Sequence, residues 1–348
     1  MTHGADARSV SVDAMHGEAA AARAPRWIAP LLVCVLAIVA TVALENAVLA
    51  RAFPHLLRFT TDFSPAYLAR ELAYVRTQPP QTIFFGDSVT WGYRLPPAQN
   101  AVSLLEARGC ACVNFSLKAG SPPNSYALAR LLVADGIRPR AVVVEINQKA
   151  FNAADDTYQT LHPGIAALAA PLLTPGDRAT LRGIPAGGPR AQLEHALDAV
   201  SLLYAMRSDV RETLYGDADT VAVPHPTADL FEGTYDLSPL TPNNVGVRYL
   251  DATFRTLRAA HVPVVAFMTP TNHALLHEYI DAPQYRANVR YLVALARRDG
   301  ARVYDWDDAF PGRLFFDNAH LTAEGQRRLA ALLAHALGEP APALSSSK

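Results

Sequence analysis

The chain has 348 residues, of which 50% are hydrophobic and 18% charged, a composition typical of one large globular domain with attachments or of two small domains. Its 31 basic and 32 acidic residues give a formal net charge of −1, so it has no electrostatic footprint for binding nucleic acid.

Three cysteines do not make a disulfide framework. Cys110 and Cys112 share a face of a predicted strand, where a bridge would be strained. We therefore expect small buried apolar side chains at Cys34, Cys110 and Cys112.

The N-terminal part of the chain changes character twice. Residues 1–26 are polar, Ala-rich and without periodicity, which predicts a disordered tail. Residues 27–44 are apolar and uncharged, and this run is just long enough to span a bilayer as a helix. We place the transmembrane helix at 27–50. Arg23 and Arg26 precede this run, and by the positive-inside rule they favour a cytoplasmic tail, although Arg51 and Arg58 follow it. We predict a single-pass inner-membrane protein whose catalytic domain lies in the periplasm.

Two other interpretations of this apolar run stay open. A cleavable signal peptide could end at Ala50, because Val48 and Ala50 occupy the small-residue positions of a cleavage site. A buried core helix is disfavoured because the run is apolar all round and lies outside the predicted catalytic module. Residues 51–80 are predicted to form a helical connector that ends at two prolines.

Alternating strand and helix patterns fill residues 81–338. Short apolar runs predict five strands, at residues 82–85, 110–115, 141–146, 262–268 and 301–304. Amphipathic patterns predict helices at residues 98–108, 125–135, 245–261, 282–300 and 323–337. This alternation is typical of an α/β fold with a doubly wound, flavodoxin-like, parallel five-stranded sheet. In such a sheet the active site lies beyond the carboxyl ends of the strands.

The regular alternation stops between residues 152 and 244. This stretch contains a helical pattern at 191–214 among segments rich in Pro, Gly and Ala. It is too long for an ordinary crossover, so we interpret it as a mainly helical insertion that caps the active-site edge. A peripheral helical appendage without substrate contact is the alternative. Residues 339–348 are expected to be a disordered tail.

A candidate nucleophile follows the first predicted strand. The apolar run 83–85 leads through Gly86 and Asp87 to Ser88, at the start of the next helix, where free backbone N–H groups favour an oxyanion. Near the other end of the chain, Asp317 precedes His320 by three positions, just before the last helix. Ser88, His320 and Asp317 are therefore predicted to form a catalytic triad.

Simpler roles exist for the same residues. Ser88 could be a helix N-cap, and Asp317 and His320 could cap the last helix, although Thr322 is the better N-cap. Asp87 is expected to accept backbone hydrogen bonds in its turn.

Residues 86–92 (GDSVTWG) resemble the first signature block of the SGNH (GDSL-type) hydrolases, and the Asp317-x-x-His320 motif resembles their last block. The resemblance covers residues 80–337, with a divergent middle. It implies the SGNH hydrolase fold and an acyl-enzyme on Ser88, without a cofactor or metal. In this family the oxyanion also binds to a glycine and an asparagine. The backbone N–H of Ser88 is one donor, and Gly120 resembles the glycine of the second block.

The third block departs from the family pattern. Gly-x-Asn-Asp is replaced by residues 144–151 (VEINQKAF), in which Asn147 is the best candidate for the side-chain donor and Asn152 a weaker one. A missing oxyanion donor costs on the order of 3 kcal/mol in the transition state, so this departure bears on activity.

The altered block and residues 269–272 (TPTN) resemble SGNH-like proteins of cell-envelope glycan acylation, such as alginate O-acetyltransferases and the D-alanine transfer protein of teichoic-acid synthesis. The resemblance implies an acyl-ester substrate, an envelope polysaccharide as acyl carrier, and a membrane-bound acyl donor protein as partner. We expect a serine acyl-ester hydrolase or O-acyltransferase. The alternative is a catalytically weak SGNH-fold partner protein in a polysaccharide modification complex.

Four further residues suggest a metal site or a ligand contact only superficially. His273 and His277 lie four positions apart beside Glu278, but the order differs from His-Glu-x-x-His and no third ligand is evident. We expect solvated helix residues there and no metal site. Asn272 is interpreted as a turn residue.

Overall fold

The computed structural model describes residues 28–52, 65–79, 81–183, 189–205, 207, 227–231 and 233–339. The chain divides into two compact units, residues 1–44 and 45–348. The tail predicted at 1–26 lies outside the described residues, as do residues 340–348 of the tail predicted at 339–348 and residues 53–64 of the predicted connector.

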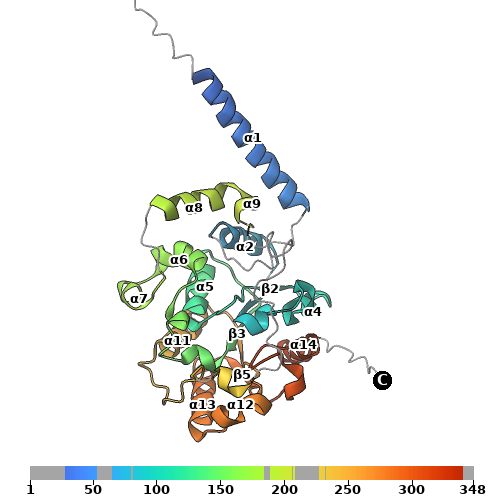
Figure 1. The fold of residues 1–348 in the computed structure, drawn as a ribbon, viewed down its shortest axis with the longest axis vertical. Helices are drawn as coiled ribbons and strands as arrows, with labels where there is room; N and C mark the ends of the chain where they lie inside the picture. Colours follow the sequence, from blue (N-terminus) through green and yellow to red (C-terminus); the bar gives the residue numbers. More distant parts are fainter. Residues whose placement is uncertain are drawn as a thin grey trace, which may run out of the picture. The chain divides into compact units, whose positions relative to one another are not determined.

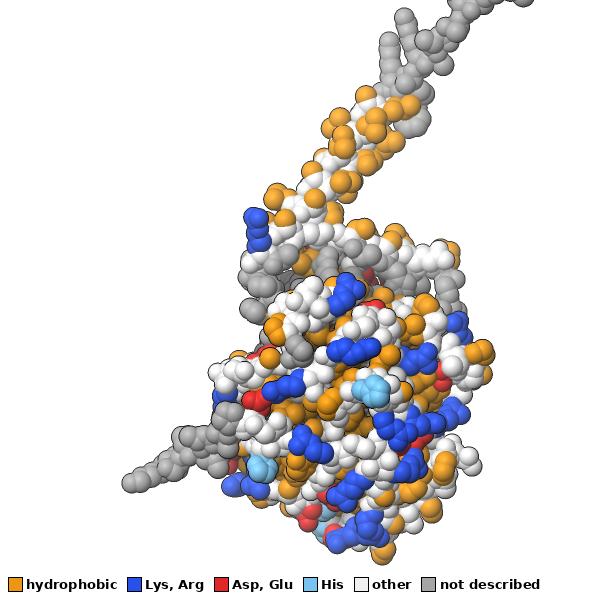
Figure 2. Space-filling view, turned by 180° about the vertical axis from the view of Figure 1, so that it is seen from behind, with side chains coloured by type: hydrophobic (Ala, Val, Ile, Leu, Met, Phe, Trp, Pro, Cys, Tyr) orange, Lys and Arg blue, Asp and Glu red, His pale blue; other side chains and the backbone are white. Residues whose placement is uncertain are grey.

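The first described helix, α1 (Ile28–Ala52), is apolar on every side. Its stretch Ile28–Leu49 has 22 residues and a mean hydropathy of 2.5, and none of it is buried. Figure 2 shows hydrophobic side chains along its length. The helix is long and apolar enough to cross a membrane, although a signal sequence has the same properties. Its exposure disfavours a core helix, and Cys34 is exposed rather than buried as expected, because it belongs to this apolar helix.

Five parallel strands form one sheet in the order β2-β1-β3-β4-β5. The strands are β1 (Thr82–Phe85), β2 (Cys112–Asn114), β3 (Ala141–Ile146), β4 (Val264–Met268) and β5 (Arg302–Asp305). The predicted doubly wound, flavodoxin-like α/β sheet is therefore confirmed, because the order reverses between β1 and β3. Strands β1 to β4 are buried on both faces, which is why they are continuous apolar runs.

Alternate side chains of the strands enter two separate cores. Ile83 and Phe85 of β1 belong to a core with α2 (Pro65–Thr77), α5 (Pro122–Ala134), α11 (Val245–Ala259) and α13 (Pro283–Arg298). Phe84 lies on the other face of the sheet, in a core with α4 (Ala101–Glu106) and α14 (Ala323–Leu337). Figure 1 shows α5 and α11 on one side of the sheet and α4 and α14 on the other. The period of two along each strand thus produces the layered architecture.

The remaining helices are short. They are α3 (Ser88–Trp91), η2 (Pro97–Gln99), η3 (Gln148–Phe151), η4 (Asp156–Gln159), α6 (Pro163–Ala169), η5 (Ala170–Leu172), α7 (Pro175–Thr180), α8 (Pro189–Val200), α9 (Leu202–Ala205), η7 (Ala228–Phe231), α12 (His273–Ile280) and η8 (Gly312–Leu314). The helix expected at 191–214 is instead α8 and α9, and most of residues 206–226 lie outside the described residues.

The insertion at 152–244 packs in two ways. Ile165 and Ala166 of α6 are fully buried in the core beside α5, whereas Leu230 and Phe231 of η7 line an open pocket described below. Part of the insertion thus belongs to the main core. A cap function for the rest stays a prediction.

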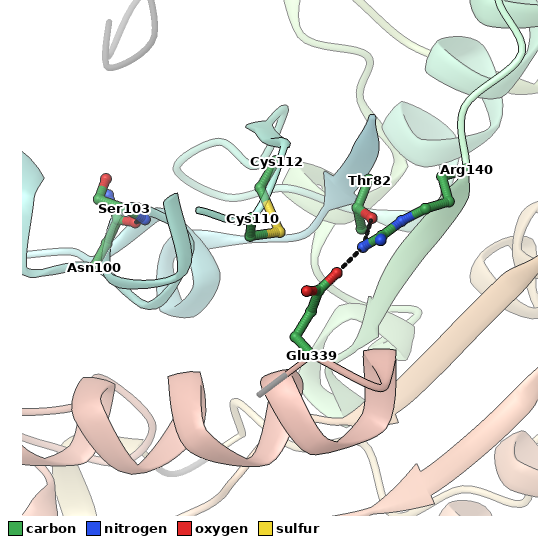
Figure 3. Close-up of a disulfide and its surroundings, with 7 residues drawn as sticks. All are labelled: Thr82, Asn100, Ser103, Cys110, Cys112, Arg140 and Glu339. Atoms are coloured by element: carbon green, nitrogen blue, oxygen red, sulfur yellow. Dashed lines mark hydrogen bonds and ion pairs between the residues drawn. A yellow bond between two sulfur atoms is a disulfide. The ribbon is translucent and has the colours of Figure 1, made fainter. Parts of the chain in front are cut away.

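Cys110 and Cys112 are buried, as predicted. The expectation that they would not be bridged is wrong, because these two residues form a disulfide (Figure 3). Strand β2 begins only at Cys112, and the Cys112 N–H donates to the Cys110 carbonyl at 2.9 Å. This tight turn shortens the Cα–Cα distance to 5.3 Å, whereas an extended strand would separate the two Cα atoms by about 6.6 Å. In the same view Arg140 donates to Thr82 and pairs with Glu339.

Candidate active site

The turn between β1 and α3 holds the candidate nucleophile at the carboxyl edge of the sheet. Asp87 caps α3, and its Oδ1 accepts the Val89 N–H at 2.8 Å, as predicted. Ser88 is the first residue of α3 and is 7% exposed. Within the described residues, no group accepts a hydrogen bond from the Ser88 backbone N–H. This N–H is therefore available to an oxyanion.

The structure brings Ser88, His320 and Asp317 into one hydrogen-bonded chain. Ser88 Oγ lies 2.8 Å from His320 Nε2, although the two residues are 232 positions apart. His320 Nδ1 lies 2.8 Å from Asp317 Oδ2. Because a carboxylate only accepts, Nδ1 carries the proton and the neutral ring presents the Nε2 lone pair to the serine hydroxyl. This is the arrangement that acyl transfer by serine requires.

Asp317 is held as a carboxylate by its surroundings. Burial alone would raise its pKa, but the hydrogen bond and charge of His320 lower it, together with the backbone N–H groups of His320 and Ala319. The net effect lowers the pKa of Asp317 to about 2. The group is thus ionised at neutral pH and can orient the imidazole.

The loop that carries Asp317 and His320 is held in place by Asn272, a residue that follows β4. Asn272, which follows β4, donates from Nδ2 to the Asp317 carbonyl at 2.9 Å and from its backbone N–H to the Asn318 carbonyl at 2.9 Å. Thr322, not His320, caps α14, so the imidazole remains available. Asn272 is a turn residue and N-cap, as predicted, and it also positions the loop of the triad.

Glu145 positions the nucleophile turn, and the sequence analysis gave it no role. Its Oε2 accepts the backbone N–H groups of Asp87 at 2.9 Å and Thr90 at 3.3 Å, and its Oε1 accepts the Thr269 hydroxyl at 2.9 Å. Burial, followed by the nearby charge of Asp87, raises the pKa of Glu145 well above its usual value. A buried acid at the end of an apolar strand was the signal that could have revealed this role.

Gly120 and Asn147, the other predicted oxyanion donors, are engaged with protein groups. The Gly120 N–H donates to the Leu117 carbonyl at 3.0 Å, and a Cβ on Gly120 would lie 2.1 Å from the Gly86 carbonyl oxygen. A glycine is needed there because the two backbones touch. Asn147 Nδ2 donates to Asp87 Oδ2 at 2.6 Å, and its second amide N–H has no acceptor among the described residues.

Asn152, the weaker alternative, lies elsewhere. Its Nδ2 donates to the carbonyls of Gly233 at 2.7 Å and Thr234 at 3.2 Å. Both of its amide hydrogens are therefore used within the protein.

A pocket of about 490 Å³ opens at the triad. Besides the triad it is lined by Tyr93, Arg94, Lys118, Ala119, Leu230, Phe231 and Asn318. The Tyr93 ring packs on His320 with centroids 4.4 Å apart, and the Lys118 ammonium lies 5.1 Å from the centroid of the Trp91 ring. Tyr93, Arg94 and Lys118 could not be assigned to the pocket from the sequence, because loop residues without periodicity give no signal of their position.

A second histidine–aspartate pair lies behind the triad loop. His273 Nε2 lies 2.9 Å from Asp307 Oδ2, so His273 is not the solvated residue that was expected. Burial would lower its pKa, but the hydrogen bond and charge of Asp307 raise it. Among the residues that the structure describes, no cluster of three or more His, Cys, Asp or Glu side chains could hold a metal ion.

The fold and the site together define a doubly wound α/β protein with a serine–histidine–aspartate arrangement at the carboxyl edge of its sheet. A protein-family model matches residues 242–340, less than half of the chain. Among curated proteins no match was found.

Several solved structures are similar to this chain. They include the psychrotrophic esterase EstA from Pseudoalteromonas sp. (12% identity, TM-score 0.38), a member of the lipolytic G-D-S-L family from Veillonella parvula (12%, 0.38) and TesA (14%, 0.37). Each comparison covers 74% of this chain and 97% of the other. Identities and scores this low transfer no activity from these proteins to this chain.

Proposed function

We propose that the protein is a membrane-anchored serine acyl-ester hydrolase or O-acyltransferase of the SGNH type. The observation that carries the proposal is the continuous hydrogen-bonded chain from Ser88 Oγ through His320 to Asp317. A serine used only as a helix cap needs no imidazole at 2.8 Å, and an imidazole held by a buried carboxylate is the general base that a serine nucleophile requires.

The proposed reaction has two halves. His320 Nε2 removes the Ser88 hydroxyl proton while Oγ attacks the ester carbonyl, and the Ser88 N–H and the second Asn147 amide N–H stabilise the oxyanion. Collapse of this intermediate expels the alcohol, which takes the proton from His320, and leaves an acyl-Ser88. Water or a sugar hydroxyl then attacks the acyl-enzyme with His320 again as base, and Ser88 recovers its proton.

Separate observations support the proposed location and the proposed substrate. A disulfide is typical of an oxidising compartment, and α1 is long and apolar enough to anchor the chain, which supports a single-pass inner-membrane protein with its domain in the periplasm. The ring of Tyr93 and the cations of Arg94 and Lys118 at the pocket support a sugar as acyl carrier or acceptor. An envelope polysaccharide and a membrane-bound acyl donor protein are the proposed partners.

A second candidate is a catalytically weak partner protein in a polysaccharide modification complex. The observation that favours it is that the Gly120 N–H and one Asn147 N–H already have acceptors within the protein. With fewer free donors the oxyanion would be less stabilised, by about 3 kcal/mol for each donor lost.

The nucleophile is tested with a fluorophosphonate probe and with p-nitrophenyl acetate. We expect the probe to label wild type but not Ser88→Ala. The control variant is Ser103→Ala, which removes a buried hydroxyl in α4 and should still be labelled. Release of p-nitrophenol should show the same pattern. A folded wild type that neither reacts with the probe nor turns over the ester would contradict the enzyme and favour the partner protein.

Hydrolase and transferase are separated by the fate of the acyl group. An O-acyltransferase would transfer the label from a radioactive acyl ester to added polysaccharide faster than to water. A hydrolase would release free acid at a rate that the polysaccharide does not change.

A further inference from the structure

Helices α8 and α9 expose a stripe of apolar side chains. Leu193 is 60% exposed and Val200 53%, and they lie on one face of α8 because seven positions make two helical turns. Ala196, also exposed, lies between them, and Leu203 of α9 extends the stripe at 46% exposure. The other side of α8 contains the buried Asp198, and the helix packs on α2 (Figure 1).

The stripe is unusual for the surface of this domain. Outside α1, five large apolar side chains are exposed among the described residues, and three of them are Leu193, Val200 and Leu203. The other two, Leu230 and Phe316, lie at the active-site pocket or next to Asp317. A cluster of this kind, away from the active site, is typical of a surface that is covered in the working protein.

The corner between α8 and α9 is tied to the end of the apolar stretch of α1. Asn46 Nδ2 donates to the Val200 carbonyl at 2.7 Å, and Asn46 Oδ1 accepts the Leu202 N–H at 2.7 Å. Both polar atoms of one side chain therefore hold the two residues on either side of the corner.

Glu45 completes the same attachment. Its Oε1 accepts the Ser201 hydroxyl at 2.9 Å and the Leu203 N–H at 2.7 Å. Glu45 and Asn46 lie near the C-terminal end of the apolar stretch Ile28–Leu49. If that stretch crosses a bilayer with a hydrocarbon core of about 30 Å, these two polar residues lie where the chain meets the headgroups. The α8–α9 corner would then lie at the same depth.

We propose that α8 and α9 lie on the lipid surface of the membrane that α1 spans, with Leu193, Val200 and Leu203 inserted between the headgroups. An amphipathic helix with an exposed apolar face and a polar opposite face binds in the interface plane of a bilayer. The inference rests on the membrane anchor of the proposed function. It adds a second membrane contact, which would hold the catalytic domain against the bilayer.

The test uses the full chain reconstituted in vesicles of phosphatidylcholine and phosphatidylglycerol. Cys34→Ser removes the free thiol, and single cysteines are then labelled with an environment-sensitive NBD fluorophore and quenched by nitroxide lipids. The test variants are Leu193→Cys, Val200→Cys and Leu203→Cys. The controls are Ala179→Cys on α7 of the same insertion, Glu278→Cys on α12, and Val39→Cys inside α1.

The inference predicts blue-shifted, lipid-quenched emission at the three test positions and water-like emission at Ala179→Cys and Glu278→Cys. Water-like emission at the test positions would overturn it. Blue-shifted emission that nitroxide lipids do not quench would also overturn it, because another part of this chain or a second copy would then cover the stripe. Absence of quenching at Val39→Cys would refute the anchor itself, independently of the esterase assay. Circular dichroism melting confirms that each variant is folded.

Discussion

At the scale of the residue, the two oxygens of Asp317 have separate tasks. Oδ2 binds the His320 ring at Nδ1, whereas Oδ1 accepts the backbone N–H groups of His320 and Ala319. The carboxylate thus fixes both the ring and the backbone that carries it. Any change to this group is expected to alter the tautomer of the imidazole before it alters the fold.

The substitution Asp317→Asn tests this role. An amide in place of the carboxylate can keep the contact but stabilises the wrong tautomer, with the proton on Nε2 facing Ser88. We expect kcat for p-nitrophenyl acetate to fall by about 10³–10⁴-fold with little change in KM. A fall of less than ten-fold would contradict the assignment.

The pKa of Asp317 predicts how stability depends on pH. Because folding lowers this pKa from 3.8 to about 2, the ionised group stabilises the folded state. The contribution is fully present above about pH 4, is lost as the pH falls through 2, and amounts to about 2 kcal/mol.

Urea unfolding measures this contribution. The difference in the free energy of unfolding between wild type and Asp317→Asn should be largest at pH 5 and should shrink by about 2 kcal/mol at pH 2. A difference that does not change between these two pH values would contradict the lowered pKa.

At the scale of the element, the nucleophile turn depends on β3. Glu145 near the end of β3 and Asn147 just after it bind the backbone and the side chain of Asp87. Neither hydrogen bond could be predicted from the sequence, because the contacts between neighbouring parallel strands depend on their register. That register pairs Phe85 with Val144 and so brings Glu145 beside the turn after β1.

Substitution of Glu145 should disturb the turn to an extent that depends on how many of its hydrogen-bond acceptors are removed. Glu145→Ala leaves the N–H groups of Asp87 and Thr90 buried without an acceptor, which costs about 1–3 kcal/mol of unfolding free energy. Because Ser88 lies between them, we expect kcat to fall as well. Glu145→Gln keeps one carbonyl oxygen and should retain most activity, as measured by esterase kinetics beside urea unfolding. Equal activity in all three proteins would contradict the positioning role.

The strands and helices of the sheet could be predicted because most of the strands are continuous apolar runs and the helices between them have an amphipathic pattern. The disulfide between Cys110 and Cys112 could not be predicted, because β2 starts two residues later than expected and the two cysteines then lie in a turn before the strand. The contact between Ser88 and His320 could be predicted because both residues lie beside elements with clear patterns, whereas their role as a catalytic triad stays a proposal. The pocket residues Tyr93 and Lys118 could not be predicted, because they lie in loops, which have no such periodicity.

At the scale of the whole molecule, the disulfide is more informative about the compartment in which the domain lies than about the stability of the fold. It closes a loop of only three residues, and the chain-entropy model gives such a loop a contribution of about 1–2 kcal/mol. Its presence in the mature protein would instead report that the domain reached an oxidising environment.

Thiol titration tests whether the disulfide is present in the mature protein. The denatured protein purified from membranes should expose one reactive thiol, that of Cys34, and three after reduction. The double variant Cys110→Ser with Cys112→Ser should lose about 1–2 kcal/mol of unfolding free energy and keep its esterase activity. Three thiols without reduction would place the domain in a reducing compartment.

The separation of 232 positions between Ser88 and His320 has a consequence for biosynthesis. The segment that carries Asp317 and His320 is synthesised after β1 to β4. A chain that has been synthesised only as far as β4 therefore lacks the imidazole that the proposed reaction requires. Under this proposal, Ser88 would become reactive only once that segment has packed beside the sheet.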